Sequence, residues 1–206
     1  MTGITIIEGA DTNAVADWLE ARLRAALVEK AAISVPGGST PFPIFEALAD
    51  RDLDFAQLAI WPNDDRIVPE EHEASNTGKI RALFEPEGAE IVALAEGAAA
   101  PSFAFVWLGM GEDGHIASLF PNTDPQVDDP QAVRRLTPDP LPPHAPFDRI
   151  TLTLPALLNT RELMFLIRGE EKRAVFDAAA GGASDLPVAR LLRAARERGI
   201  PVTVFA

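Results

Sequence analysis

The chain has 206 residues, 47% of them apolar, which is enough to build one α/β domain around a sizeable core. It contains no cysteine, which excludes disulfides, thiolate nucleophiles and cysteine-based zinc sites. The formal net charge of −13 disfavours nucleic acid as a partner. It also repels anionic small molecules, so such a ligand must be held by local cations and backbone amides.

Apolar segments of strand length alternate with segments of helical period along the chain. The expected strands lie at 4–8, 31–35, 58–62, 90–94, 102–109, 133–136, 150–154, 163–169 and 200–206, and the expected helices at 11–30, 40–50, 75–84, 170–180 and 186–199. Buried strands between helices predict a mostly parallel central sheet covered by helices on both faces. We expect residues 1–206 to form a single domain of this α/β class.

Three helix starts carry capping signals. Asp11 or Thr12 is expected to cap the first helix, and Ser75 or Asn76 the third. Thr40 is expected to cap the second helix, with proline at its first turn, where a missing N–H costs little.

Targeting signals are not evident, because no apolar run is long enough to span a bilayer and no basic segment precedes an apolar one at the N-terminus. We therefore expect a cytoplasmic protein without a membrane partner, either a monomer or a weak homo-oligomer. Residues 121–149 are rich in proline and are expected to be a surface connection or a binding loop.

In open α/β sheets, ligands bind beyond the carboxyl ends of the strands, and the loop after the second strand suits this role. Gly37 and Gly38 let the backbone approach a ligand closely, and Ser39 and Thr40 offer hydroxyl groups. The following helix directs its unpaired N–H groups and its dipole at the same place. The loop is either a phosphate cradle or an ordinary strand-to-helix turn.

Two acidic residues and an arginine leave the third strand together. One carboxylate, Asp64 or Asp65, is expected to face the site while Arg66 clamps an anion; alternatively Asp65 pairs with Arg66 in a solvated turn. His72 stands among glutamates and is expected to be solvated.

The segment "WLGMGEDGHIASLFP" is unusual for the end of a buried strand. Gly109, Gly111 and Gly114 make the backbone permissive and offer amides for an oxyanion hole. Asp113 and His115 bring a carboxylate and an imidazole that could accept a proton at neutral pH. We interpret this segment as catalytic, although a histidine that only satisfies a turn carbonyl would be the plainer alternative.

Two later cations complete the set of candidates. Arg149 precedes an expected strand, and Lys172 lies in the first turn of a helix, where it opposes the helix dipole unless it meets an anion. The sequence does not show which of Arg66, Arg149 and Lys172 would contact a phosphate.

Together the segments "GGSTP", "DDRIVP", "GMGEDGHIASLFP", "RITLTLPALLN" and "GEEKRAVF" resemble the 6-phosphogluconolactonase family, in order and over nearly the whole chain. The resemblance implies a modified Rossmann-like fold related to glucosamine-6-phosphate deaminase and ribose-5-phosphate isomerase. It implies hydrolysis of 6-phospho-D-glucono-1,5-lactone without a metal or organic cofactor. Two departures stand out: Asp65 replaces the usual glutamate of the Asp-Glu-Arg motif, and Ile116 replaces the usual threonine.

Residue by residue, the resemblance makes His115 the general base that activates water and Asp113 its neighbour. It assigns the substrate and phosphate side of the site to Gly37, Gly38, Ser39, Thr40, Asp64, Arg66, Arg149 and Lys172. One alternative is a sugar-phosphate isomerase or deaminase, although such deaminases follow the histidine with Ala-Phe-Asn-Glu-Pro, where this chain has "ASLFP" at 117–121. A sugar-phosphate-binding regulator without turnover is a second alternative, but no DNA-binding domain is visible.

Overall fold

A computed structural model describes residues 3–141 and 145–206. Its helices are α1 (Thr12–Ala26), α2 (Phe42–Ala49), α3 (Asn76–Phe84), α4 (Leu154–Leu157), α5 (Glu170–Ala180) and α6 (Pro187–Arg198), with short 3-10 turns at Phe55–Gln57 and Pro121–Thr123. Its strands are β1 (Ile4–Ile7), β2 (Ala31–Val35), β3 (Leu58–Pro62), β4 (Asp64–Arg66), β5 (Glu90–Ile91), β6 (Phe105–Leu108), β7 (Val133–Leu136), β8 (Arg149–Leu152), β9 (Leu163–Leu166) and β10 (Val202–Phe205).

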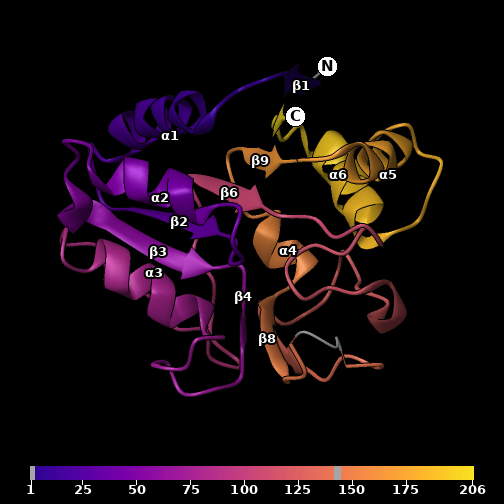
Figure 1. Ribbon diagram of the computed structural model, residues 1–206. Coiled ribbons are helices and arrows are strands. Elements are labelled where there is room, and N and C mark those ends of the chain that lie inside the picture. The colour runs from indigo at the N-terminus through magenta and orange to yellow at the C-terminus, as the bar shows by residue number, and fades with distance from the viewer. Residues whose placement is uncertain (1–2, 142–144) are drawn as a thin grey trace.

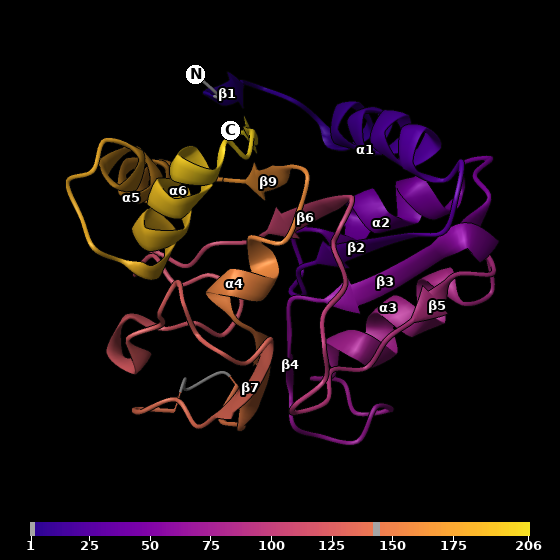
Figure 2. The same cartoon turned by 180° about the vertical axis from the view of Figure 1, so that it is seen from behind.

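The main sheet has seven strands in the order β1-β10-β9-β6-β2-β3-β5, and every neighbouring pair is parallel. Helices cover both of its faces, as the sequence predicts (Figures 1 and 2). β6 shows how the alternation of side chains achieves this. Phe105 and Trp107 pack with α1, α2 and α3 on one face, whereas Val106 and Leu108 pack with α4, α5 and α6 on the other.

A second, antiparallel sheet of three strands in the order β4-β8-β7 was not foreseen. β4 follows β3 after the single residue Asn63, and Asp64 pairs with Thr151 of β8. The expected strand at 133–136 is β7 of this small sheet. The strand expected at 150–154 is β8, which ends at Leu152 because Leu154 already begins α4. β4 and β8 extend from the end of β3, away from the main sheet (Figure 1).

The expected caps are right at two helices and wrong at one. Asp11 accepts a hydrogen bond from the Ala14 amide at 2.8 Å, and Ser75 accepts one from Gly78 at 3.0 Å. Thr40 does not cap α2, whose N-cap is Pro41 without a side-chain bond. The residue three positions after Thr40 is a proline, so the amide that a threonine cap would bind is missing.

Candidate active site

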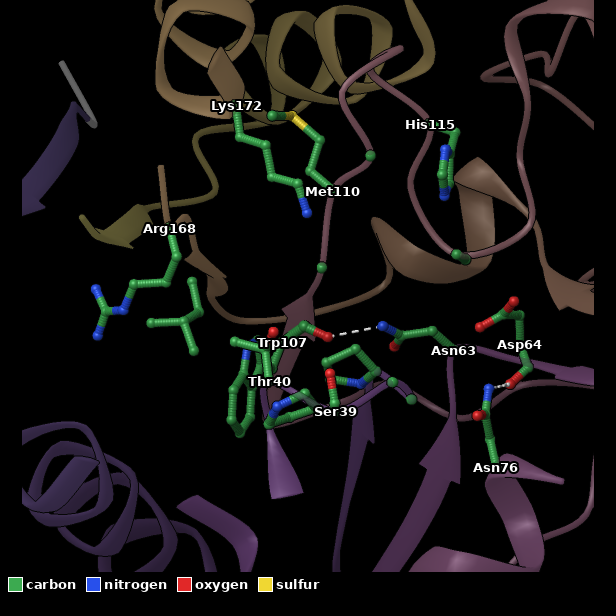
Figure 3. Close-up of a pocket in the computed structure, with 18 of the residues that line it drawn as sticks. Ser39, Thr40, Asn63, Asp64, Asn76, Trp107, Met110, His115, Arg168 and Lys172 are labelled. Atoms are coloured by element: carbon green, nitrogen blue, oxygen red, sulfur yellow. Dashed lines mark hydrogen bonds between the residues drawn. The ribbon is translucent and has the colours of Figure 1, made fainter. Parts of the chain in front are cut away.

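The carboxyl ends of β2, β3, β6 and β9 meet at one edge of the sheet and border a cavity of about 350 Å³. The cavity is lined by Pro36, Gly37, Gly38, Ser39, Thr40, Pro41, Asn63, Asp64, Arg66, Asn76, Trp107, Gly109, Met110, Gly111, His115, Ala117, Leu166, Arg168 and Lys172 (Figure 3). It therefore collects most of the side chains that the sequence singles out.

His115 and Asp113 form a hydrogen-bonded pair on the turn after β6. The distance between Nδ1 of His115 and Oδ1 of Asp113 is 2.6 Å, and the same oxygen accepts the His115 amide at 3.1 Å. The His115 ring also lies 4.9 Å from the ring of Phe120, which limits its movement. An ionised carboxylate can only accept, so a neutral imidazole in this contact carries its proton on Nδ1 and keeps a free lone pair on Nε2. This is the tautomer of a general base.

Gly111 is required by this pair rather than by its own backbone angles, since its φ is not positive. A Cβ at Gly111 would lie 2.2 Å from Nδ1 and Cε1 of His115 and 2.6 Å from Oδ1 of Asp113. The His115 imidazole and the Asp113 carboxylate occupy the space that a side chain at position 111 would fill.

Two left-handed residues bend the rest of the turn. Gly114 has a φ of +76°, and Ala117 has a φ of 49°, which is uncommon for a residue with a Cβ. Ala117, which lies between His115 and Ser118 along the chain, lines the cavity. The conformation of Ala117 lets His115 face the cavity while Ser118 bonds to β4 from the same turn.

The expectation that three glycine amides form an oxyanion hole needs correction for two of them. The Gly111 amide donates to the His115 carbonyl at 2.9 Å, and the Gly114 amide donates to the Gly111 carbonyl at 3.0 Å. These bonds hold the turn together, and Gly114 does not line the cavity. Gly109 lines the cavity and stays a candidate.

The loop at 37–40 approaches the cavity from the end of β2. A Cβ at Gly37 would overlap the side chain of Asn76, with its nearest atom at 2.0 Å, and Gly38 has a φ of +89°. The two glycines therefore allow the close approach and the turn that the sequence suggests. Ser39 and Thr40 line the cavity beside them (Figure 3).

Asn63 is a site residue that the sequence analysis missed. Its Nδ2 donates to the Trp107 carbonyl at 2.8 Å (Figure 3). Its Oδ1 accepts the Ser34 hydroxyl at 2.6 Å. These bonds tie together the ends of β3, β6 and β2. The sequence feature that could have identified Asn63 is its position immediately after an apolar strand of a parallel sheet.

Asp64 and Asp65 have different roles because neighbouring strand residues point to opposite faces. Asp64 lines the cavity, whereas Asp65 is buried and accepts hydrogen bonds from the amides of Arg66, Asn76 and Thr77 and from two hydroxyl groups. The solvated Asp65–Arg66 pair is therefore wrong. Asp65 holds the N-terminus of α3, where its charge also complements the helix dipole.

The Asp64 carboxyl carries the main electrostatic perturbation of the cavity. Burial raises the pKa of Asp64, while the hydrogen bond from Ser118 and the charges of Arg66 and Arg149 oppose the rise. Burial also lowers the pKa of Arg149, with the charge of Arg66 acting in the same direction. The charges of the two arginines and Asp64 thus act on one another at this end of the site.

The cations divide into three groups. Lys172 and Arg168 lie on the side of the cavity away from His115 and Asp64 (Figure 3). Arg66 also lines the cavity, and its Nη1 donates to the Ala74 carbonyl at 2.9 Å and to the Asn76 side chain at 3.3 Å. Arg149 does not line the cavity, because its side chain is buried against its own loop.

Arg149 therefore does not fit the expectation that it contacts a ligand. Its two terminal nitrogens donate to the carbonyls of Phe147 and Ala145, at 2.5 Å and 2.8 Å. Arg168 is the cation that the sequence analysis overlooked. It follows β9, and one of its nitrogens donates to the Ala10 carbonyl at 2.7 Å, which anchors the side chain at the cavity rim.

The remaining expectations concern residues outside the cavity. His72 is exposed, as expected, and its Nδ1 accepts the Ala74 amide at 3.0 Å. The described residues of 121–149 do not line the cavity, and Pro142 and Pro143 lie outside the described residues. Within residues 3–141 and 145–206, no three potential metal ligands gather, and no helix has the length and apolarity to cross a membrane.

Comparisons with known proteins place the chain in a family. The family model described as glucosamine-6-phosphate isomerases/6-phosphogluconolactonase matches residues 9–94 and 84–199. A 6-phosphogluconolactonase of Neisseria meningitidis is 36% identical over 196 residues, covering 82% of this chain and 84% of the relative. One of Pseudomonas aeruginosa is 35% identical over 199 residues, covering 84% and 83%. The crystal structure of a Shewanella baltica 6-phosphogluconolactonase superposes with a TM-score of 0.79 at 26% identity, covering 100% of this chain and 97% of that one.

Proposed function

The chain belongs to the glucosamine-6-phosphate isomerase/6-phosphogluconolactonase family, and from this premise we propose that it hydrolyses 6-phospho-D-glucono-1,5-lactone to 6-phospho-D-gluconate. This reaction is the second step of the oxidative pentose phosphate pathway, and we place it in the cytoplasm. The observation that carries the proposal is His115 at the wall of the cavity, with its Nδ1 hydrogen-bonded to Asp113. A lactone carbonyl needs an activated water, and this pair supplies the base.

The 6-phosphate binds at the end of the cavity that holds Lys172 and Arg168, with the 37–40 loop beneath it. Each charge-assisted hydrogen bond there contributes about 1.5–3 kcal/mol. These local charges offset the repulsion expected from the net charge of −13. Binding of the remote phosphate positions the lactone carbonyl near His115.

Nε2 of His115 removes a proton from water as the water oxygen attacks the lactone carbonyl carbon. General base catalysis of this kind contributes about 10²–10⁴-fold. Asp113 keeps the imidazole in the correct tautomer and stabilises the imidazolium that forms. The bond from the carbonyl carbon to the ring oxygen then breaks, and the imidazolium returns its proton to that oxygen. Water has then been added across the ester bond, and His115 is neutral again.

The test is hydrolysis of the lactone generated from glucose 6-phosphate by its dehydrogenase. Excess 6-phosphogluconate dehydrogenase reports the product as a second NADPH signal. We expect hydrolysis well above the spontaneous rate. The absence of acceleration by folded protein would refute the proposal. Ammonia release from glucosamine 6-phosphate would then test the deaminase alternative.

A further inference from the structure

We propose that Asp64, held in place by Ser118, recognises the hydroxyl group next to the lactone carbonyl and so sets the specificity of the site. This inference rests on the proposed function, because it assigns a further part of the same substrate. It concerns Ser118 in particular, whose role neither the sequence pattern nor the cavity lining indicates.

The chemistry of a carboxylate limits what Asp64 can bind. Asp64 is the one acidic residue among the described residues that line the cavity. In its ionised form, a carboxylate only accepts hydrogen bonds and repels a phosphate, so its partner on the ligand must be a hydrogen-bond donor. On a phosphorylated sugar lactone, the neutral donors are hydroxyl groups. The phosphate-binding part of the expectation for Asp64 is therefore replaced by hydroxyl recognition.

The position of Asp64 selects the hydroxyl group. Asp64 lies on the side of the cavity away from Lys172 and Arg168, where the phosphate binds (Figure 3). With the phosphate on C6 at that end, the other end receives C1 and C2. The C2 hydroxyl is next to the carbonyl that the water activated by His115 attacks, so a carboxylate at this end fits that hydroxyl.

Ser118 fixes the carboxylate in this place. Its hydroxyl donates to Oδ2 of Asp64, while its own amide is held by Oγ1 of Thr151 at 3.2 Å. The Asp64 carbonyl accepts the Asn76 side chain at 2.9 Å. Among the residues that the structure describes, Oδ1 of Asp64 has no hydrogen-bond partner and is not a buried orphan. One oxygen is thus anchored by protein, and the other is available to a ligand.

The anchor also connects recognition to catalysis. Ser118 is three residues after His115 in the same turn, and the left-handed Ala117 lies between them. The turn that carries the base is therefore bonded to the carboxylate that reads the neighbouring hydroxyl. A lactone that satisfies Asp64 places its carbonyl at a defined position relative to His115.

The experiment compares two lactones, made from glucose 6-phosphate and 2-deoxyglucose 6-phosphate, by trapping the remaining lactone with hydroxylamine. We expect the wild-type protein to prefer the hydroxylated lactone in kcat/KM by about 10- to 100-fold, the value of one hydrogen bond to a charged group. Asp64→Asn should reduce kcat/KM for that lactone by a similar factor and leave the 2-deoxy lactone within a few-fold. Ser118→Ala should show the same pattern, less strongly.

Thr203→Val provides a matched control. The Thr203 hydroxyl is also buried and also donates to a carboxylate, Oε1 of Glu162 at 3.0 Å, but it does not line the cavity. Its loss should change the melting temperature without changing the ratio of the two lactones. In a double-mutant cycle, Ser118→Ala should add little once Asp64 has become Asn.

Equal losses on both lactones in Asp64→Asn would overturn the proposal, and so would a wild-type protein that does not discriminate between them. If Asp64→Asn does not fold, an unchanged lactone ratio in Ser118→Ala refutes it instead. A wild-type protein that hydrolyses neither lactone refutes the proposed function, and this outcome is distinct from loss of discrimination.

Discussion

Replacing Gly111 by alanine tests the arrangement of the catalytic pair without removing either member. The new Cβ would lie 2.2 Å from Nδ1 and Cε1 of His115, whereas unstrained contacts begin at about 3.5 Å. The imidazole must therefore move by about 1 Å or more, and a displacement of that size can cost about 10²-fold in rate. We expect kcat to fall by about this factor in the coupled lactonase assay.

The fold should tolerate this change. The φ of Gly111 is not positive, so alanine introduces no backbone strain, and the side chains it displaces are 33% and 53% exposed. The free energy of unfolding should stay within about 1 kcal/mol of the wild-type value. Gly181→Ala, which adds a methyl group at the end of α5 against the Asp177 carbonyl at 3.3 Å, is the control and should keep wild-type kcat. Wild-type kcat in Gly111→Ala would refute the pairing as the source of the rate.

Three further predictions follow from the same geometry. Arg168→Ala and Lys172→Ala should each raise KM by about tenfold or more and leave kcat within a few-fold of the wild-type value. The increase in KM should become smaller as salt is added. A fall in kcat at unchanged KM would contradict phosphate binding by these residues. Asp65→Ala should lower the free energy of unfolding in urea by about 3 kcal/mol or more, because five donors lose their acceptor; wild-type stability would contradict the clamp. Burial raises the pKa of Asp64, so the folded protein binds this proton more tightly than the unfolded chain, and the contribution of Asp64 to stability falls as pH rises above about 4. Asparagine does not titrate, so the melting temperature of Asp64→Asn minus that of the wild type should increase between pH 4 and pH 7. A difference that stays constant over this range would contradict a raised pKa.

Local patterns in the sequence predict much of the fold. The bounds of the strand at 133–136 and of the helix at 170–180 match the structure in full, although only the helix has a clear apolar period. The strand expected at 90–94 is only Glu90–Ile91, followed by one more bond to β3 from the Val92 amide to the Ile60 carbonyl at 3.0 Å. The antiparallel sheet was missed because β4 and β8 are far apart in sequence, and nothing local specifies their pairing.

The site was predicted where chemistry and chain position agree. His115 and the 37–40 loop follow parallel strands and carry polar groups among glycines, so the rule for strand ends places them at the cavity. Asp113 comes with them through its hydrogen bond to His115, although it does not line the cavity. The same rule would have found Arg168, which instead reads as the tail of an apolar strand. The expectation for Arg149 was wrong because the surrounding sequence does not reveal that nearby backbone carbonyls bind its guanidinium group.

The measurement that tests the account most directly is kcat and KM of His115→Ala for lactone hydrolysis beside the wild-type protein. The account predicts a fall in kcat of about 10²–10⁴-fold with a much smaller change in KM, because the imidazole moves a proton and the phosphate supplies the binding. A kcat equal to that of the wild type would remove His115 from the reaction and contradict the account.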